Sequence, residues 1–381
     1  MERASISREL QFKGLTLDEL KEYFKSIGEP KFRAGQVFNW MYNHLVEDFN
    51  EMLNLPKSLR AELSKKYQLR TLNYLDSVVS TQTGTKKFVF SLRDGLTETT
   101  GKHKIESVII PEETCLAFGE PRRKRTTICI STQVGCPLDC KFCATGLMGY
   151  KKNLTAGEIF DQYMLAAKDY GKDKITNIVY MGMGEPLLNF KATINSLKIF
   201  AEQLTTGISL KKITISTAGI APKIIELADS GLKTKLALSL HSCFEDVRTK
   251  IMPINKKYSL KQNIDAVKYY SKKTGTRITF EYVMLNDIND RDEDLKALVK
   301  LCRQIPCKIN VIPFNSLEHM NPKGFSAKLK PSPRQRINKF VEALREKNIT
   351  VTVRYTQGED IAAACGQLAI TEEDNSYTTV R

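Results

Sequence analysis

Long apolar runs are missing from this chain of 381 residues. None approaches the roughly 20 apolar residues that a helix needs to cross a bilayer, so we expect no association with a membrane. The first residues, MERASISREL, carry charges without an apolar segment behind them, which argues against a signal peptide. The sequence therefore predicts a cytoplasmic protein, in which cysteine thiols stay reduced.

Acidic residues are also in short supply. Asp and Glu number 43 against 58 Lys and Arg, which gives a formal net charge of +15. Such an excess suggests a polyanionic partner, most often nucleic acid or an anionic membrane surface. The alternative is a basic protein whose lysines are merely solvated, and charge alone does not decide between the two.

Solenoid repeats and low-complexity segments are absent as well. Because the chain is longer than one simple core usually needs, we expect two or three domains. Within residues 1–74, apolar spacing predicts three short amphipathic helices, over 16–28, 33–45 and 56–67. This basic helical domain would be an RNA-docking appendage, a lid or a dimerisation element.

The remaining chain has the patterns of strands and of strand–helix alternation. Residues 75–125 predict a small antiparallel β element and a linker. Residues 126–369 alternate strands with helices, which implies parallel βα units, and residues 370–381 form a tail. We predict an α/β fold in which about six units form a partial TIM-like barrel; an open doubly wound sheet is the alternative. Both place their chemistry at the C-terminal ends of the strands.

Cysteine is scarce, yet three of the nine cysteines are crowded together. Cys136, Cys140 and Cys143 follow a C-x3-C-x2-C spacing, with Phe142 before the third. An odd total fits poorly with a closed disulfide framework, and three thiolates are too few for a closed structural zinc site. Three cysteines can hold a 4Fe-4S cluster and leave one iron open. Zinc binding and simple packing are the alternatives.

Polar residues follow several of the predicted strands, at the end where chemistry is expected. One strand ends in the glycine-rich turn YMGMGEP, which contains Gly184 and Glu185, and later strands end at Ser216, at Ser239 and His241, and at Asn315. Each one alone would be read as a cap or a loop residue. A series at successive strand ends is less easily accidental.

The three-cysteine motif and the MGMGEP turn resemble the radical S-adenosylmethionine (radical SAM) superfamily. The resemblance implies a barrel of that type, a 4Fe-4S cluster on Cys136, Cys140 and Cys143, and SAM as second cofactor, cleaved reductively to a 5′-deoxyadenosyl radical. The SAM-binding positions that it implies are Gly184, Glu185, Ser216, Ser239, Leu240, His241 and Asn315.

A narrower resemblance covers roughly residues 15–369. The segments CISTQVGC, STAGIAP, LSLHS, MPINKKY, EYVMLNDIND and DIAAACGQLA are similar to the RlmN/Cfr family of radical SAM adenine methyltransferases. The resemblance implies methylation of an adenosine in 23S rRNA and of adenosine 37 in tRNA, an electron donor such as flavodoxin with its reductase, and a monomer. Pro186 and Glu281 favour C2 as the methylated atom over C8.

The same resemblance implies roles for two isolated cysteines, which by themselves would be read as small buried apolar residues. Cys365 would be methylated by one SAM and then attacked by the radical from a second. Its methylene would join the adenine, and Cys129 would release the product by forming a disulfide with Cys365. Glu106 would accept the proton lost by the adduct, with Glu112 and Glu113 close in sequence.

Four cysteines have no role in this scheme. Cys115 lies in the stretch 114–125, which is longer than usual for the family, and we interpret it as a bystander. Cys243, Cys302 and Cys307 are interpreted as packing residues. Two other functional classes compete: an RNA-binding scaffold with a structural metal, which would not require Cys129 and Cys365, and a radical SAM enzyme acting on a small molecule, which would leave the basic helical domain unexplained.

Overall fold

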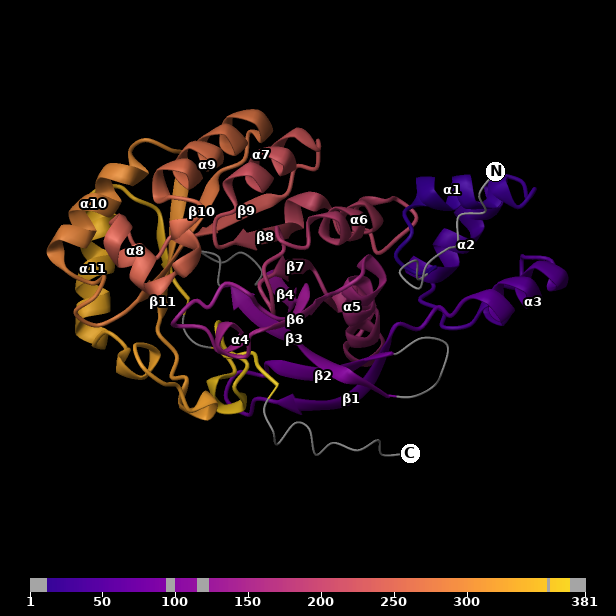
Figure 1. Cartoon of the computed structure of the whole chain (residues 1–381), viewed down its shortest axis with the longest axis horizontal. Coiled ribbons are helices and arrows are strands. Elements are labelled where there is room, and N and C mark those ends of the chain that lie inside the picture. Colours follow the sequence, from indigo (N-terminus) through magenta and orange to yellow (C-terminus); the bar gives the residue numbers. More distant parts are fainter. Residues whose placement is uncertain (1–11, 94–99, 115–122, 355–356, 371–381) are drawn as a thin grey trace.

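The computed structural model describes residues 12–93, 100–114, 123–354 and 357–370 (Figure 1). Cys115 and most of the stretch 114–125 lie outside the described residues, as does the tail from residue 371. The side chains of Glu112 and Glu113 are also outside the description. Among the helices that are described, none has both the length and the apolar character needed to cross a membrane.

Three helices open the chain, as the sequence predicted: α1 (Leu17–Ser26), α2 (Phe32–Tyr42) and α3 (Lys57–Lys66). The first begins with a capping box, in which the Thr16 hydroxyl accepts from the backbone of Glu19 and the Glu19 carboxylate accepts from Thr16. Leu20 and Phe24 form its buried face. In Figure 1 these helices lie at one end of the molecule, beside α5 and α6.

One sheet of ten strands forms the body of the molecule. In spatial order its strands are β1 (Leu72–Val79), β2 (Lys86–Arg93), β3 (Thr100–Thr114), β4 (Arg123–Cys129), β7 (Asn177–Tyr180), β8 (Ile213–Thr217), β9 (Lys235–Ser239), β10 (Ile278–Met284), β11 (Cys307–Pro313) and β12 (Val351–Val353). The strands β1 to β4 pair antiparallel, and every pair from β4 to β12 is parallel. The element predicted within 75–125 therefore continues the barrel sheet, and the domain limits drawn there stay a prediction.

Helices follow the parallel strands and cover the outer side of the curved sheet (Figure 1). They are α5 (Ala156–Tyr170), α6 (Phe190–Ala201), α7 (Ala221–Asp229), α8 (Glu245–Ile251), α9 (Leu260–Thr274), α10 (Asp292–Cys302) and α11 (Arg334–Glu346). The segments of α6 and α8 were not predicted as helices. The α/β fold with a partial parallel barrel and an N-terminal helical part is confirmed.

Candidate active site

The three crowded cysteines lie in a loop after β4 that a small hairpin closes. The hairpin consists of β5 (Gln133–Gly135) and β6 (Tyr150–Asn153). Gly135 has φ +70°, and a Cβ there would come within 1.8 Å of the Gly149 carbonyl oxygen, so the turn requires glycine. The Cys136 amide donates to the same oxygen at 3.1 Å. Cys143 directly precedes the short helix α4 (Ala144–Leu147).

A cavity of about 160 Å³ lies between this loop and the C-terminal ends of the parallel strands. We call it the cysteine cavity. Most of the predicted cofactor positions line it: Cys136, Cys140, Cys143, Gly184, Glu185, Ser216, Ser239, His241 and Asn315. Leu240 does not line it, because its side chain is buried in the core. The structure thus gathers nine of the predicted positions around one cavity.

The chemistry of the three thiols suits an iron–sulfur cluster. Burial raises the pKa of Cys136 to about 12 and also raises the pKa values of Cys140 and Cys143, so thiolates here need a cationic partner. Among the described residues, no three His, Cys, Asp or Glu side chains form a group that could hold a single metal ion. Each iron of a cluster takes its own thiolate, so a cluster accepts this wider spacing.

The glycine-rich turn after β7 packs tightly against the segment that leads into the cysteine loop. Gly184 has φ +96°, and a Cβ there would lie 2.5 Å from Cβ of Gln133. The next residue, Glu185, is buried, and its carboxylate accepts from the amides of Leu187 at 3.0 Å and Ala218 at 2.7 Å. Burial raises the pKa of Glu185 to about 7. The turn therefore brings a backbone free of side chains and a carboxyl group to the cavity.

His241 lines the cavity as a neutral imidazole. Burial, together with the nearby Arg248 guanidinium, lowers its pKa to about 3. Its Nδ1 accepts from the Val283 amide at 3.0 Å, so the single ring proton sits on Nε2. The Phe142 ring, whose position before the third cysteine was noted in the sequence, meets the imidazole edge-on at 4.6 Å between centroids.

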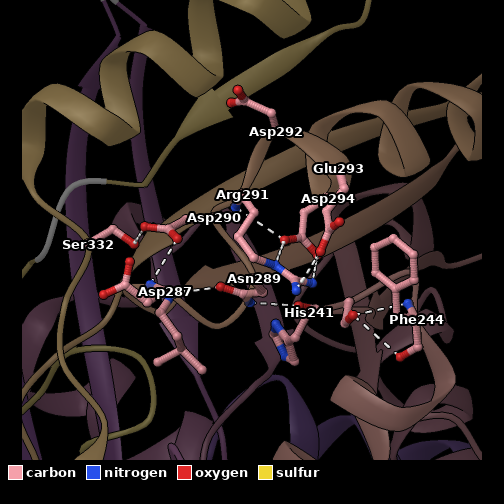
Figure 2. Close-up of polar contacts among 12 residues, drawn as sticks. His241, Phe244, Asp287, Asn289, Asp290, Arg291, Asp292, Glu293, Asp294 and Ser332 are labelled. Carbon is pink, nitrogen blue, oxygen red and sulfur yellow. Dashed lines mark hydrogen bonds and ion pairs between the residues drawn. The ribbon is translucent and has the colours of Figure 1, made fainter.

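Two buried residues that support these strand ends were not identified from the sequence. Asn289 donates to the carbonyl oxygens of His241 at 2.6 Å and of Val283 at 2.7 Å; Figure 2 shows it beside His241. Arg248 is fully buried and donates to the carbonyl oxygens of Ala218 and Ser239, which follow or end β8 and β9. Asn289 lies in the segment EYVMLNDIND, which was a usable signal, whereas nothing in the sequence set Arg248 apart.

The segment that carries Cys365 is docked against the cysteine loop. The Gly366 carbonyl accepts from the Ala144 amide at 2.7 Å, and the Leu368 carbonyl accepts from the Thr145 hydroxyl at 2.6 Å. Asn315, at the end of β11, donates to the Cys365 carbonyl at 3.0 Å. The Cys365 side chain is exposed and lines the cysteine cavity.

A second, wider cavity of about 1300 Å³ occupies the inside of the barrel, and we call it the lumen. It adjoins the cysteine cavity, because both are lined by Cys365, Glu281, Asn315 and Arg354, among others. Cys129, the last residue of β4, lines the lumen together with Cys365. Burial, and next the neighbouring Cys365, raises the pKa of Cys129 to about 12. The two isolated cysteines therefore face one space.

Glu106 lies in β3, fully buried, and lines neither cavity. Its carboxylate accepts from the Ala369 amide at 2.9 Å and forms an ion pair with Lys87 at 2.8 Å. Ala369 belongs to the segment that carries Cys365, so Glu106 contacts this segment directly. To lose a proton to Glu106, the adduct on Cys365 would have to approach a carboxylate that already contacts Ala369 and Lys87.

Known proteins resemble the chain over nearly its full length. Residues 10–69 match the model of the ribosomal RNA large subunit methyltransferase N-terminal domain, and residues 130–301 match the radical SAM superfamily. The chain is 43% identical over 362 residues to a protein of Thermotoga neapolitana named probable dual-specificity RNA methyltransferase RlmN, covering 95% of this chain and 98% of the relative. The dual-specificity RNA methyltransferase RlmN of Pseudomonas entomophila is 41% identical over 376 residues, covering 97% and 92%.

A solved structure has the same fold. The crystal structure of a radical SAM methyltransferase from Sphaerobacter thermophilus superposes with a TM-score of 0.81 at 39% identity. The match covers 94% of this chain and 99% of that chain. The same fold therefore extends over nearly the whole of both chains.

Proposed function

This chain belongs to the RlmN family of radical SAM RNA methyltransferases, and from that premise we propose that it methylates C2 of an adenosine in 23S rRNA and adenosine 37 of tRNA. The proposal rests chiefly on the position of two thiols. Cys129 and Cys365 both line the lumen, and Cys365 also lines the cysteine cavity. A scaffold with a structural metal would have no use for this pair.

The cysteine cavity has the residues that a cluster and SAM need. Cys136, Cys140 and Cys143 would hold three irons of a 4Fe-4S cluster, and the turn at Gly184 and Glu185 would receive the SAM amino group. When bound, the cluster and SAM supply a methyl group to the Cys365 sulfur in one half of the cycle and a hydrogen-abstracting radical in the other. Neutral His241 adds a hydrogen-bond donor to the cavity without adding charge.

Cys365 and Cys129 divide the covalent chemistry between them. Cys365 carries the methyl-derived carbon, because an aromatic C2 is no nucleophile for direct methyl transfer. Once that carbon is joined to the base, the Cys129 sulfur attacks the Cys365 sulfur and loses its proton as the S–S bond forms. The S–C bond breaks, its electron pair stays on the carbon, and that carbon takes up a proton to become the methyl group of the RNA. A dithiol reductant must then reopen the disulfide.

Burial of the Cys129 thiol keeps it from attacking the Cys365 sulfur before the adduct has formed. With its pKa raised to about 12, the thiol stays protonated at neutral pH and does not form the disulfide prematurely. Glu106 is our candidate for the base that takes the proton from the former aromatic carbon, and the unpaired electron of the adduct would pass to the cluster held by Cys136, Cys140 and Cys143. Its contact with Ala369 puts it beside the Cys365 segment, and Lys87 balances its charge.

The reaction is tested by mass analysis of nucleosides. Anaerobically reconstituted protein is incubated with 23S rRNA or tRNA, SAM and reduced flavodoxin, and the RNA is digested. We expect 2-methyladenosine from both RNAs. Production of 8-methyladenosine would place the enzyme in the C8 branch of the family, and the absence of any methyladenosine would overturn the proposed function.

The Cys129→Ala variant tests the division of roles. Without the resolving thiol we expect RNA to stay covalently attached to Cys365, seen as a nuclease-sensitive band of higher mass in cells that make the variant. The matched control is Cys302→Ala, a substitution at a thiol that lines neither cavity. A variant at Cys129 that releases methylated RNA at the wild-type rate would contradict the scheme.

A further inference from the structure

The lumen of this barrel differs from an ordinary barrel interior. Small parallel barrels are normally filled by layers of branched apolar side chains. Here the interior holds a cavity of about 1300 Å³, and its lining includes Arg125 on β4, Lys235 on β9 and Lys308 on β11. All three occupy the N-terminal halves of their strands. The lining also includes Asp173 and Lys174, just before β7, so the N-terminal end of the lumen carries more positive than negative charge.

The strand register places these cations in adjacent layers. Lys235 is the first residue of β9 and pairs with Thr214 of β8, while Lys308 pairs with Thr279 of β10. Arg125 lies four residues before Cys129 on the same strand, which corresponds to about 13 Å at the rise of a parallel strand. Arg125 and Cys129 thus lie at different depths of one continuous space.

The two lysines lack a direct polar contact among the described residues, although the Glu281 carboxylate is near enough to Lys308 to raise its pKa. Among the described residues, neither the Lys235 nor the Lys308 ammonium group forms an ion pair or a hydrogen bond. Partial burial lowers the pKa of both lysines, and Arg125 lowers each further. For Lys308 the Glu281 carboxylate acts in the opposite direction, while Lys235 and Arg354 add to the lowering. Such mutual repulsion is unfavourable in the free protein and is relieved by an anion placed between the lysines.

An unpartnered carboxyl oxygen lies between the cations and the thiols. Glu281 of β10 is 4% exposed and lines both the lumen and the cysteine cavity. Its Oε1 accepts from the Asn310 side chain at 2.9 Å, whereas Oε2 has no hydrogen-bond partner among the described residues. A buried polar atom without a partner costs free energy unless a ligand supplies one. An amino group on a bound base would do so.

These features match one occupant, a single nucleotide drawn out of an RNA stack. The target carbon of a stacked base is inaccessible, so the base must enter a pocket while its flanking phosphates stay outside. Building on the proposed function, we propose that the target nucleotide enters the lumen from the N-terminal ends of the strands, with Lys235 and Lys308 binding the flanking phosphates and Glu281 hydrogen-bonding the exocyclic amine of the adenine.

The phosphate contacts are tested by the salt dependence of RNA binding. The probe is a fluorescein-labelled tRNA anticodon arm with adenosine at the target position, titrated with the reconstituted enzyme by anisotropy at several KCl concentrations. For Lys235→Ala/Lys308→Ala we expect the slope of log K against log [KCl] to become shallower by about 0.7 for each lysine. We expect affinity at low salt to fall about tenfold.

The matched control removes two lysines from the outer helices. Lys296 on α10 and Lys339 on α11 are exposed and line neither cavity. Lys296→Ala/Lys339→Ala lowers the net charge equally and should bind the probe like the wild type. Equal slopes for the two double variants would overturn the proposed phosphate site. SAM binding, measured in parallel, should be unchanged in both and shows that the cysteine cavity is intact.

The contact between Glu281 and the adenine is tested by removing the exocyclic amine from the RNA and, separately, the carboxylate from the protein. Replacing the target adenosine of the probe by purine riboside removes only the exocyclic amine, and we expect the wild type to bind this probe about tenfold more weakly. Glu281→Gln keeps an acceptor and should retain the discrimination, whereas Glu281→Ala should lose it. A wild type that binds both probes equally would overturn the role of Glu281.

The outcomes separate this inference from the function on which it rests. If the wild type forms no methyladenosine, the proposed function fails whatever the lumen variants do. If the wild type methylates RNA and the lumen variant binds the probe like its control, only the inference about the lumen fails.

Discussion

At the scale of the single residue, His241 shows how burial sets the chemistry of the cavity. The folded protein lowers its pKa from 6.5 to about 3. The unfolded chain therefore binds a proton below pH 6.5 that the folded chain takes up only near pH 3. The stability contributed by the neutral ring is complete above pH 6.5 and is lost as the pH falls from 6.5 to 3.

This linkage predicts a pH-dependent difference between the wild type and His241→Asn. Asparagine tolerates the positive φ of 53° at this position, and its Oδ1 can accept the Val283 amide in place of Nδ1, but it does not titrate. Between pH 6.5 and 5 the wild type should lose about 2 kcal/mol more of its free energy of unfolding than the variant. Urea unfolding at both pH values measures this, and parallel losses would contradict the assignment of a neutral buried imidazole.

Some residues of the candidate site could be predicted from the sequence, and others could not. The spacing of Cys136, Cys140 and Cys143 predicted a cluster site, because a site of that kind can be formed by one local loop. Arg248 could not be predicted in this way, because it donates hydrogen bonds to backbone carbonyl oxygens at the ends of strands that are distant in the sequence. The placement of Glu106 against Ala369 was equally hidden, because the two residues meet only through the docking of the chain's last described segment.

At the scale of secondary-structure elements, an ion pair connects the N-terminal part to the barrel. Lys13, just before α1, contacts Asp161 of α5 at 2.6 Å, and both side chains are fully buried. Asp161 also accepts from the amide and the hydroxyl of Thr71, just before β1, at 2.9 and 2.6 Å. One carboxylate thus joins three segments of the chain.

Removing one partner of this pair should cost much more than removing both. Asp161→Ala leaves the Lys13 ammonium buried and unpaired, and we expect a loss of about 3–5 kcal/mol in the free energy of unfolding. Adding Lys13→Met to that variant removes the buried charge and should restore part of the loss. Guanidinium unfolding of the wild type, both single variants and the double variant provides the cycle. A double variant that is less stable than Asp161→Ala would show that the buried charge is not the cause.

Elements with clear periodicity were predicted, and those with weak boundaries were not. The three N-terminal helices and the parallel strands carry apolar patterns that depend only on local geometry. The helices α6 and α8 were missed, and α8 is only seven residues long. That β3 pairs with β4, so that the antiparallel strands extend the barrel sheet, follows from a contact that the local pattern does not contain.

At the scale of the whole molecule, folding brings together two thiols from opposite parts of the chain. Oxidised glutathione should therefore convert Cys129 and Cys365 of the folded protein into a disulfide and release two molecules of reduced glutathione. The experiment uses a Cys136→Ala/Cys140→Ala/Cys143→Ala background, so that the cluster thiols do not compete. We expect a linked peptide by mass spectrometry from the folded protein and only scattered pairings from protein oxidised in urea. Identical pairings in both conditions would contradict the arrangement of the lumen.

The family, the three-cysteine motif, the α/β fold and the positive charge could all be predicted from the amino-acid sequence, because spacing, periodicity and composition are local or additive properties. The folded structure was needed to show that Cys129 and Cys365 face one lumen, that Arg248 and Asn289 hydrogen-bond the strand ends, and that Lys235, Lys308 and Glu281 line the same cavity. These facts depend on the register and curvature of a sheet whose strands come from distant parts of the chain. Contacts between such strands are set by packing of the whole core, which no single segment encodes.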